Sequence, residues 1–506
     1  MNIRIMIMVI ICFLTVKASF VHCANSSRIA GARYPGTYLG MKVEQTRNST
    51  QEERQLKSKH TARQAKKVSL HQLDQETLQT MLSHESSKDI IGVSREINVL
   101  KEQQGMQWNK LPQGGVTSSF LFTSPGAAAL RIGIAIHSLP FLAELRFFQG
   151  NMVNEQAEVA VKGREINRLI QLNMQAEPDN PSSNVYWSPV IAGESLGIEI
   201  YLPQNVESQG VQLTFPMLSH FAVSPFSSSE HQFINQSYGD SSTCQNDATC
   251  YPAWLDTRDA VAKMVYTEFG DSYTCSGTLL NDADATTWKP YFISANHCIA
   301  SQTVASTLQT VWFFESSTCN GITRNANYAI RNGGATLLWT EGTTKNNVDS
   351  NQDASFFKLH DLPPAGAYYA GWNISFNFSE LVGIHHPAGD WKKISFGEYA
   401  EMSRCYLDSN DLDFYCTPSF TGSFLQVNWT TGGTEPGSSG SGIFSSTKDL
   451  VGMLKGGNGG CDDNAVSIYS TFSAAYSAGN LGQWLNTAPS PDNRASIVPI
   501  LMLLSQ

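Results

Sequence analysis

The stretch Thr434-Glu-Pro-Gly-Ser-Ser-Gly-Ser441, entered from Val427-Asn-Trp429, decides how the rest of this 506-residue chain is interpreted. Its centre, Gly437-Ser-Ser-Gly440, is a G-x-S-G turn in which glycines permit backbone angles that cost other residues energy. Such a turn can hold Ser439 out of a sheet as a nucleophile, with the amides of Gly437 and Ser439 directed into one small oxyanion-binding space. Because a Gly/Ser-rich segment between strands is more often an ordinary turn, the catalytic interpretation requires a base and an acid elsewhere.

Two other segments supply these partners. A serine nucleophile needs an imidazole to accept its proton and an acid to hold that imidazole in one tautomer. The segment Pro290-Tyr-Phe-Ile-Ser-Ala-Asn-His-Cys298 predicts a strand that ends in a small-residue turn with His297 at its tip. Asp353 directly precedes an apolar β-run, where its carboxylate can be buried against the histidine. Asp349 is the alternative acid and fits this position less well.

The three segments resemble the signatures of chymotrypsin-fold serine proteases, which share the chain order His, Asp, Ser. The part from Cys244 to Trp484, about half of the chain, is similar to the secreted lysyl endopeptidases of bacteria. The further matching features are the paired cysteines Cys244 and Cys250, Gly383-Ile-His-His-Pro387, and Leu454-Lys-Gly-Gly457 followed by Cys461. The resemblance implies an all-β domain of two antiparallel barrels that hydrolyses peptide bonds through an acyl-enzyme, without a cofactor.

The resemblance also assigns roles to individual residues. His297 is expected to be the general base, Asp353 the acid that orients it, and Ser439 the nucleophile. The amides of Gly437 and Ser439 are expected to form the oxyanion hole.

The cysteines predict a disulfide framework. Eight of the ten follow residue 243, and an even number in an exported domain is typical of disulfide bonding. The resemblance implies the pairs Cys244–Cys461, Cys250–Cys319 and Cys275–Cys298, of which the last would fix the turn that carries His297. Cys405 and Cys416 remain, and we expect them to clip a local loop. No Cys/His cluster has zinc spacing, so no metal site is predicted.

The specificity region departs from the relatives. Lysyl endopeptidases carry an aspartate after their last cysteine, and the shorter segment here places Val466 at that position. Asp462 or Asp463 could replace it only if the loop takes another route. Lys455, next to Gly456, stands where the relatives have histidine, and a cation near the pocket entrance would disfavour basic side chains and attract acidic ones. The alternative is that Lys455 extends to solvent. Cleavage that is not simply after lysine is therefore expected, with Lys455, Gly456 and Val466 as candidate substrate-binding residues.

His385 and His386 form a rival candidate site. Adjacent residues on a strand point to opposite faces, so the pair would chelate a metal poorly and at most one could face a site. A structural role at a strand end is favoured.

Composition limits the possible partners. The net charge is −10 and no basic stripe is present, so nucleic acid is not expected as a partner. From Ser241 onward there are 24 acidic and 13 basic residues, and the preceding part holds the remaining 20 acidic and 21 basic ones. This change in charge favours a boundary near residue 240.

The chain is divided into five predicted parts. Residues 1–24 have the charged, apolar and small-residue regions of a secretory signal peptide and are too short to span a bilayer. A polar leader follows over residues 25–104, with one candidate amphipathic helix near Leu70 to Leu82, although partial disorder is the preferred interpretation. Next come a β-sandwich-like pro-domain over 105–235, the protease domain over 236–490 and a tail over 491–506. Residues 224–239 are the expected linker.

We therefore predict a secreted pre-pro serine endopeptidase, extracellular or periplasmic, monomeric and without a membrane anchor. Its partners would be polypeptide substrates and its own pro-region, which assists folding or masks the cleft. A second hypothesis from another class is a catalytically silent binding module for protein or glycan on a protease fold. Esterase activity is a third, weaker hypothesis.

Overall fold

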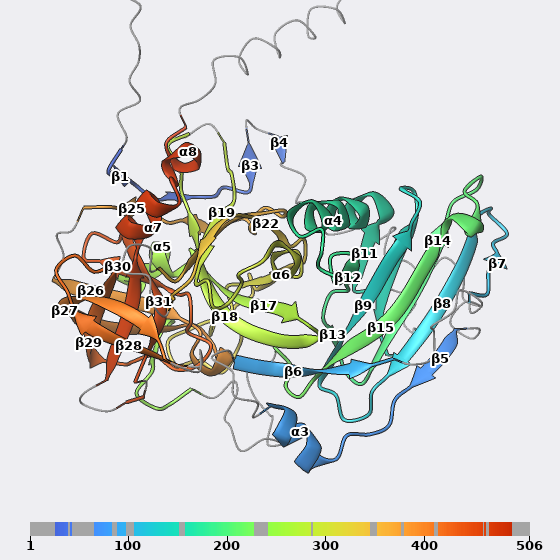
Figure 1. Ribbon diagram of the computed structural model, residues 1–506, viewed down its shortest axis with the longest axis horizontal. Helices are drawn as coiled ribbons and strands as arrows, with labels where there is room; N and C mark the ends of the chain where they lie inside the picture. Colours follow the sequence, from blue (N-terminus) through green and yellow to red (C-terminus); the bar gives the residue numbers. More distant parts are fainter. Residues whose placement is uncertain are drawn as a thin grey trace, which may run out of the picture. The chain divides into compact units, whose positions relative to one another are not determined.

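Short, mainly antiparallel strands are the main regular structure of the described chain, as the alternating apolar residues predict (Figure 1). The structure is a computed structural model that describes residues 26–38, 41–42, 65–82, 89–97, 106–150, 157–226, 241–284, 287–344, 352–375, 379–408, 413–458, 460–461 and 465–487. The predicted signal peptide, the tail over 491–506, and Asp349, Asp462 and Asp463 lie outside these residues.

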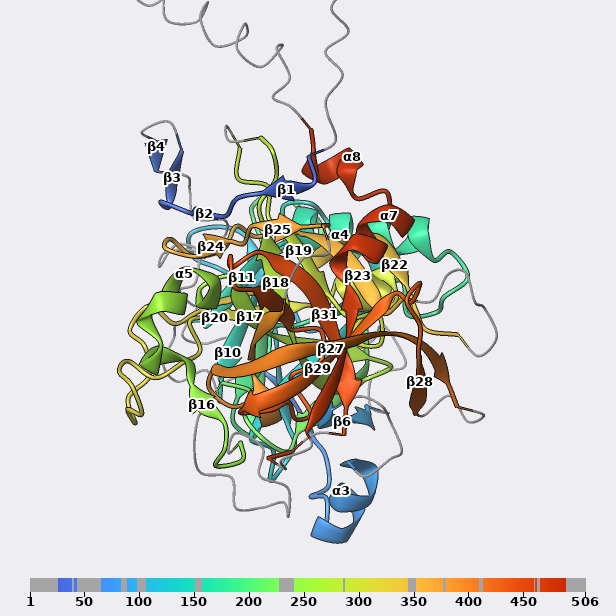
Figure 2. The same ribbon diagram turned by 90° about the vertical axis from the view of Figure 1, so that its left-hand side faces the viewer.

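The C-terminal strands close into a six-stranded barrel. Around the ring, each strand pairs with the next, and the last pairs again with the first. The strands in ring order are β26 (Glu380–His385), β27 (Lys393–Leu407), β29 (Phe424–Thr431), β32 (Val466–Thr471), β31 (Leu450–Gly457) and β30 (Gly442–Ser445). Leu425, Ile443 and Tyr469 are among the fully buried residues that fill it. The hairpin of β27 with β28 (Phe414–Pro418) projects from this barrel (Figure 2).

The preceding strands form an open half-barrel. Its core contains the fully buried side chains of Phe292, Trp312 and Phe357, which belong to one apolar cluster. The strands are β17 (Val261–Glu268), β18 (Asp271–Leu280), β19 (Tyr291–Ser294), β20 (Gln309–Trp312), β21 (Ala329–Arg331), β22 (Ala335–Glu341) and β23 (Ala354–Leu359). The all-β fold with two barrel-like sheets is thus confirmed.

Two packed sheets form the predicted pro-domain, and β5 (Lys66–Ser69) and β6 (Asp89–Glu96) join them from the predicted polar leader. The two sheets share one apolar core in which Phe120, Ile132 and Ile198 are buried, and α4 (Gly163–Ala176) adds Ile166 to it. One sheet contains β5, β7 (Asn109–Lys110), β8 (Val116–Thr123), β10 (Glu144–Gln149), β11 (Val159–Lys162) and β14 (Ser195–Leu202). The other begins with β6, β9 (Ala129–Ser138), β12 (Val185–Trp187), β13 (Ile191–Ala192) and β15 (Gln212–Phe221). The β-sandwich character is confirmed.

Strand β6 joins the predicted pro-region to the half-barrel. It pairs with β15 on one side and with β18 on the other, so one sheet runs through both parts of the chain (Figure 1). Its residue Asp89 lies opposite Thr274 of β18. The polar leader therefore contains ordered strands, among them β5 and β6, which the preferred interpretation of partial disorder did not include. The candidate helix is also present, as α3 (Gln75–Leu82).

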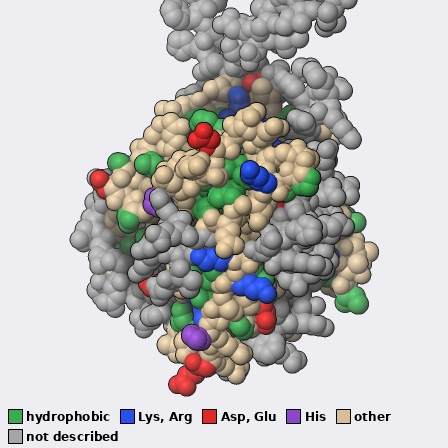
Figure 3. Space-filling view, turned by 90° about the vertical axis from the view of Figure 1, so that its right-hand side faces the viewer, with side chains coloured by type: hydrophobic (Ala, Val, Ile, Leu, Met, Phe, Trp, Pro, Cys, Tyr) green, Lys and Arg blue, Asp and Glu red, His purple; other side chains and the backbone are tan. Residues whose placement is uncertain are grey.

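The remaining elements are short. They are β1 (Arg28–Ile29), β2 (Ala32–Arg33), β3 (Thr37–Tyr38), β4 (Met41–Lys42), β16 (Asn246–Asp247), β24 (Tyr368–Tyr369), β25 (Trp372–Asn373), α5 (Leu255–Arg258), α6 (Gln302–Ala305), α7 (Phe472–Ala478) and α8 (Gly482–Leu485). None of the helices that the structure describes is long and apolar enough to cross a bilayer. On the face that carries the pro-domain strands, basic and acidic side chains lie among uncharged ones (Figure 3).

Arg131 is one of several buried polar contacts between the two parts. Its guanidinium is buried and donates to Ser188 O within the pro-domain and to Thr267 Oγ1 and Thr307 O across the boundary. Apolar side chains from both parts, including Phe221 and Val265, pack beside it. An unmade buried hydrogen bond costs more than a made one contributes, so this cation ties the two parts together.

Replacing Arg131 with methionine is therefore expected to destabilise the full-length chain by about 2–5 kcal/mol, because three buried acceptors lose their donor. The measurement is urea unfolding in a Ser439→Ala background, which prevents self-digestion. Arg168→Met, at an exposed position of α4, is the matched control and should change stability by less than about 0.5 kcal/mol. Equal unfolding midpoints for the two variants would contradict the role of Arg131.

Candidate active site

Strand pairing brings His297 and Asp353 together. Ser294 at the end of β19 lies opposite Ser355 at the start of β23, and the strands are antiparallel, so the turn after β19 meets the residue before β23. His297 Nδ1 is 2.7 Å from Asp353 Oδ2, and the backbone N–H of His297 donates to Oδ1 over 2.9 Å. This contact puts the proton on Nδ1 and leaves Nε2 as the basic nitrogen.

The Asp353 carboxylate is buried where the two barrels meet. Only 1% of its side chain is exposed, and Lys455 of β31 places Nζ 3.4 Å from Oδ2. Burial by itself would raise the pKa of Asp353, but the charges of His297 and Lys455 and the hydrogen bonds from His297 outweigh it and lower that pKa. The carboxylate is therefore ionised at neutral pH.

The nucleophile turn lies between β29 and β30. Gly437 and Gly440 adopt φ values of 88° and 76°, which side chains other than hydrogen rarely allow. A Cβ on Gly440 would also collide with Ser294 Oγ. Both glycines of the G-x-S-G pattern are thus required by the backbone, as the sequence predicts.

Hydrogen bonds fix the peptide groups of this turn one by one. The carbonyls of Gly437 and Ser439 accept from the side chain and the backbone N–H of Ser276, over 2.9 and 2.8 Å. The N–H groups of Ser438 and Gly440 donate to carbonyls of the chain. The N–H groups of Gly437 and Ser439 donate to no acceptor in the described parts of the chain. Two alternate amides are therefore available to one ligand oxygen, which is the arrangement expected of an oxyanion hole.

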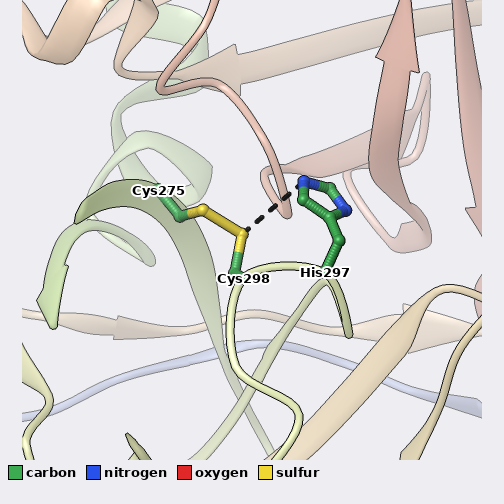
Figure 4. A group of neighbouring side chains, drawn as sticks. All are labelled: Cys275, His297 and Cys298. Atoms are coloured by element: carbon green, nitrogen blue, oxygen red, sulfur yellow. Dashed lines mark hydrogen bonds between the residues drawn. A yellow bond between two sulfur atoms is a disulfide. The ribbon is translucent and has the colours of Figure 1, made fainter. Parts of the chain in front are cut away.

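His297 and Ser439 are not hydrogen-bonded to each other. The Cys275–Cys298 disulfide and the N–H of Ser276, which donates to the Ser439 carbonyl, connect their two turns through β18. His297 Nε2 lies 3.9 Å from Cys298 Sγ, and Figure 4 shows the ring beside the Cys275–Cys298 disulfide. Both sulfurs are oxidised in that bond and offer no thiolate, so this Cys/His group cannot hold a metal as a cysteine site would. Catalytic hydrogen bonds are often long without substrate and tighten in the complex.

The structure contains the four predicted disulfides, Cys244–Cys461, Cys250–Cys319, Cys275–Cys298 and Cys405–Cys416. The third ties the His297 turn to β18. The fourth closes the β27–β28 hairpin.

The candidate specificity residues lie on β31 and β32. Lys455 does not extend to solvent: 5% of its side chain is exposed, and its Nζ lies between the Asp353 carboxylate and the Phe414 ring. A Cβ on Gly456 would touch that same ring at 3.0 Å. Val466 begins β32 opposite Asn428. The ammonium of Lys455 thus faces the acid of the site, a position that its place in the sequence did not reveal.

His385 and His386 are fully buried and have different partners. His385 Nδ1 is 2.7 Å from Ser438 Oγ, and His386 Nδ1 is 3.0 Å from the carbonyl of Asp390. The two rings therefore do not converge on one ligand. Burial, with Lys393 nearby, lowers the pKa of His385 to about 3, and burial lowers the pKa of His386 as well.

Sequence reasoning missed Ser276 and Ser438 as supports of the nucleophile turn. Ser276 lies in the middle of an ordinary strand, and no local pattern distinguishes it. Ser438 stands inside the motif itself, but its partner is 53 residues away in the chain.

Two barrels with a serine turn, a histidine and an aspartate at their junction, together with four disulfides, are features of one class, the proteases of chymotrypsin fold. Comparison with known proteins agrees with this class. Residues 238–473 match the family model "Lysyl endopeptidase, C-terminal domain", and residues 61–222 match "Lysyl endopeptidase N-terminal domain". The lysyl endopeptidase of Pseudomonas aeruginosa is 32% identical over 394 residues, 74% of this chain and 76% of that protein. The chain belongs to the lysyl endopeptidase family.

More distant similarities are of lower identity. Secreted RxLR effector protein 73 of Plasmopara viticola is 23% identical over 410 residues, 76% of this chain and 89% of that protein. Among solved structures, an HtrA-type protease AlgW with tripeptide has a TM-score of 0.29 at 16% identity. The match covers 46% of this chain and 62% of the AlgW chain. A thermostable serine protease AL20 from an extremophilic microorganism has a TM-score of 0.29 at 14% identity, covering 45% and 98%.

The buried histidines predict a loss of stability in acid. A histidine in the unfolded chain titrates near pH 6.5, whereas His385 does so at about 3 when folded. Stability is therefore complete above about pH 6.5 and falls as the pH drops toward 3, because only the unfolded chain takes up the proton. Urea midpoints of Ser439→Ala between pH 7.5 and 4.5 measure this. His385→Phe should flatten the slope, and an unchanged slope would contradict the assignment.

Proposed function

We propose that this chain is a serine endopeptidase in which Ser439, His297 and Asp353 form a catalytic triad. Ser439 Oγ attacks the carbonyl carbon of a peptide bond while His297 Nε2 accepts its proton. The tetrahedral intermediate collapses, the bond to nitrogen breaks, and His297 returns the proton to the leaving amine. Water then hydrolyses the acyl-enzyme by the same route.

The observation that carries the proposal is the pair of unoccupied amides at Gly437 and Ser439, on a turn in which the N–H groups of Ser438 and Gly440 and the carbonyls of Gly437 and Ser439 are hydrogen-bonded. A turn that served only as a connection would have no need to leave two alternate donors free. The two hydrogen bonds from His297 to one buried carboxylate support the same reading. A silent binding module is the alternative, and no contact of the described site favours it.

Substitutions of the triad test this function. Ser439→Ala should abolish cleavage of a peptide library read by mass spectrometry. Asp353→Asn should lower kcat by about 10⁴-fold, because the wrong imidazole tautomer is stabilised. Asp361→Asn is the matched control, since Asp361 is also buried in the half-barrel but accepts from Asn332 and Gly333. If the correctly processed wild type cuts no peptide, the binding-module hypothesis is favoured over the endopeptidase hypothesis.

We further propose that residues 25–235 act as a pro-region that is cut between about 224 and 243. Two contacts support this. Strand β6 covers the edge of β18 up to Thr274, two residues from Ser276, and Arg131 is buried against the half-barrel. An uncut chain with full activity would argue against masking of the active site by the pro-region.

We also propose that cleavage is not restricted to lysine. Val466 offers no charge to a substrate ammonium, and the Lys455 ammonium already lies beside Asp353. Library digestion should show cuts after residues other than lysine, and Val466→Asp should raise the share of cuts after lysine at least tenfold, because a carboxylate would pair with the substrate cation. Val466→Asn, of similar size and without charge, is the control. Wild-type cuts confined to lysine would contradict this proposal.

A further inference from the structure

A second layer of contacts surrounds the nucleophile turn and has no part in the triad. It comes from His385 and Ala388, in the segment where β26 ends and the chain turns toward β27. This segment contacts the nucleophile turn at two places. One contact is to the carbonyl of the Pro436–Gly437 peptide, and the other is to the side chain of Ser438, the residue between the two free amides.

The first contact sets the direction of the Gly437 amide. The N–H of Ala388 donates to the carbonyl of Pro436 over 2.6 Å. In a trans peptide the carbonyl and the following N–H point in opposite directions. Since the Pro436 carbonyl is held toward Ala388, the N–H of Gly437 is turned to the other side, where no acceptor of the described chain reaches it. A reversed peptide would fill the hole with a carbonyl oxygen instead.

The second contact holds the residue between the two free amides. Ser438 is fully buried, and its Oγ is 2.7 Å from His385 Nδ1. On the other side of the ring, His385 Nε2 is 3.1 Å from Ser395 Oγ. Ser395 Oγ donates to the carbonyl of Gly433 and accepts the N–H of the same residue. The Ser395 hydroxyl proton is therefore committed, so His385 carries its own proton on Nε2 and accepts the Ser438 proton on Nδ1.

This chain of hydrogen bonds is complete. Ser438 Oγ also accepts the N–H of Glu435 over 3.2 Å, so the hydroxyl both donates and accepts. Every polar atom of His385 and Ser438 has a partner in the interior, and a fully satisfied buried network allows one arrangement of the backbone around it. The network spans β26, β27 and the loop that enters the nucleophile turn.

The segment is itself held from several sides. Ala388 has a φ of 50°, which a side chain adopts only when its surroundings impose it. Buried Lys263 donates to the carbonyl of Gly389 over 2.6 Å, and the N–H of His386 donates to Ser276 Oγ. Ser276 in turn holds the Gly437 carbonyl. The segment and the half-barrel thus act on the same peptide groups.

We propose that the His385–Asp390 segment holds the peptide groups of the nucleophile turn in the orientation that keeps the oxyanion hole open. In this proposal His385 is a positioning residue that acts through Ser438. The inference rests on the proposed serine endopeptidase function and concerns the same site. It assigns a role in catalysis to a histidine whose ring bonds to Ser438 and Ser395 and to no residue of the triad.

The test uses His385→Phe, Ser438→Ala and the double variant in the processed enzyme. A donor lost from an oxyanion hole costs about 10²–10³-fold in kcat, and a hole that is open only part of the time should cost less. We expect kcat to fall about 10- to 100-fold in each single variant while KM changes less than about twofold. The double variant should fall no further than the worse single one, because one hydrogen-bonded unit is removed in all three.

A peptide-aldehyde inhibitor gives the second readout, because its adduct places an oxygen in the hole. Its affinity should drop in proportion to kcat/KM, whereas the affinity for a peptide product should not. His360→Phe is the matched control: His360 also bonds through both ring nitrogens, to Thr336 and Gly333 in the half-barrel, and its loss should change kcat less than about twofold.

Three outcomes overturn the inference: unchanged kcat in Ser438→Ala, equal losses in His385→Phe and His360→Phe, or a rise in KM that accounts for the whole loss. Should His385→Phe yield no folded protein, Ser438→Ala carries the test, since it removes one oxygen atom. Failure of the proposed function itself is distinct, because the wild-type enzyme would then cut nothing.

Discussion

The buried carboxylate of Asp353 is the constraint on which the site depends. An ion in the interior is tolerated only with partners that offset its lost hydration, and here the partners come from both barrels. His297 approaches from the half-barrel with two N–H groups, and Lys455 approaches from the closed barrel. One charge therefore fixes the imidazole and the junction of the two sheets together.

The nucleophile turn likewise depends on contacts from both barrels. Its glycines give the chain the angles it needs, but the direction of each peptide group is set by atoms outside the turn. Ser276 acts from the half-barrel, and Ala388 and His385 act from the closed barrel. A free amide at Gly437 is thus a property of the assembled barrels, since the isolated sequence could place the same peptide in either orientation.

The proposed pro-region is joined to the half-barrel by main-chain pairing as well as by side chains. Strand β6 completes a sheet that would otherwise end at an exposed edge of β18, and such edges are covered or blunted in folded proteins. Together with buried Arg131, this pairing gives a physical basis for a leader that assists folding of the protease part.

The sequence by itself determined the elements whose signals are local. Alternating apolar residues gave the strands and the all-β class, the glycines of 437–440 gave the turn, and the order of His297, Asp353 and Ser439 together with the cysteines pointed to the family. Strand β6 was missed because Asp89–Glu96 mixes charged and apolar residues and is stabilised by neighbours far away in the chain. The direction of Lys455, the hold of Ser276 and the link of His385 to Ser438 were decided only by tertiary structure, because each is a contact between residues more than 50 positions apart, which no spacing along the chain encodes.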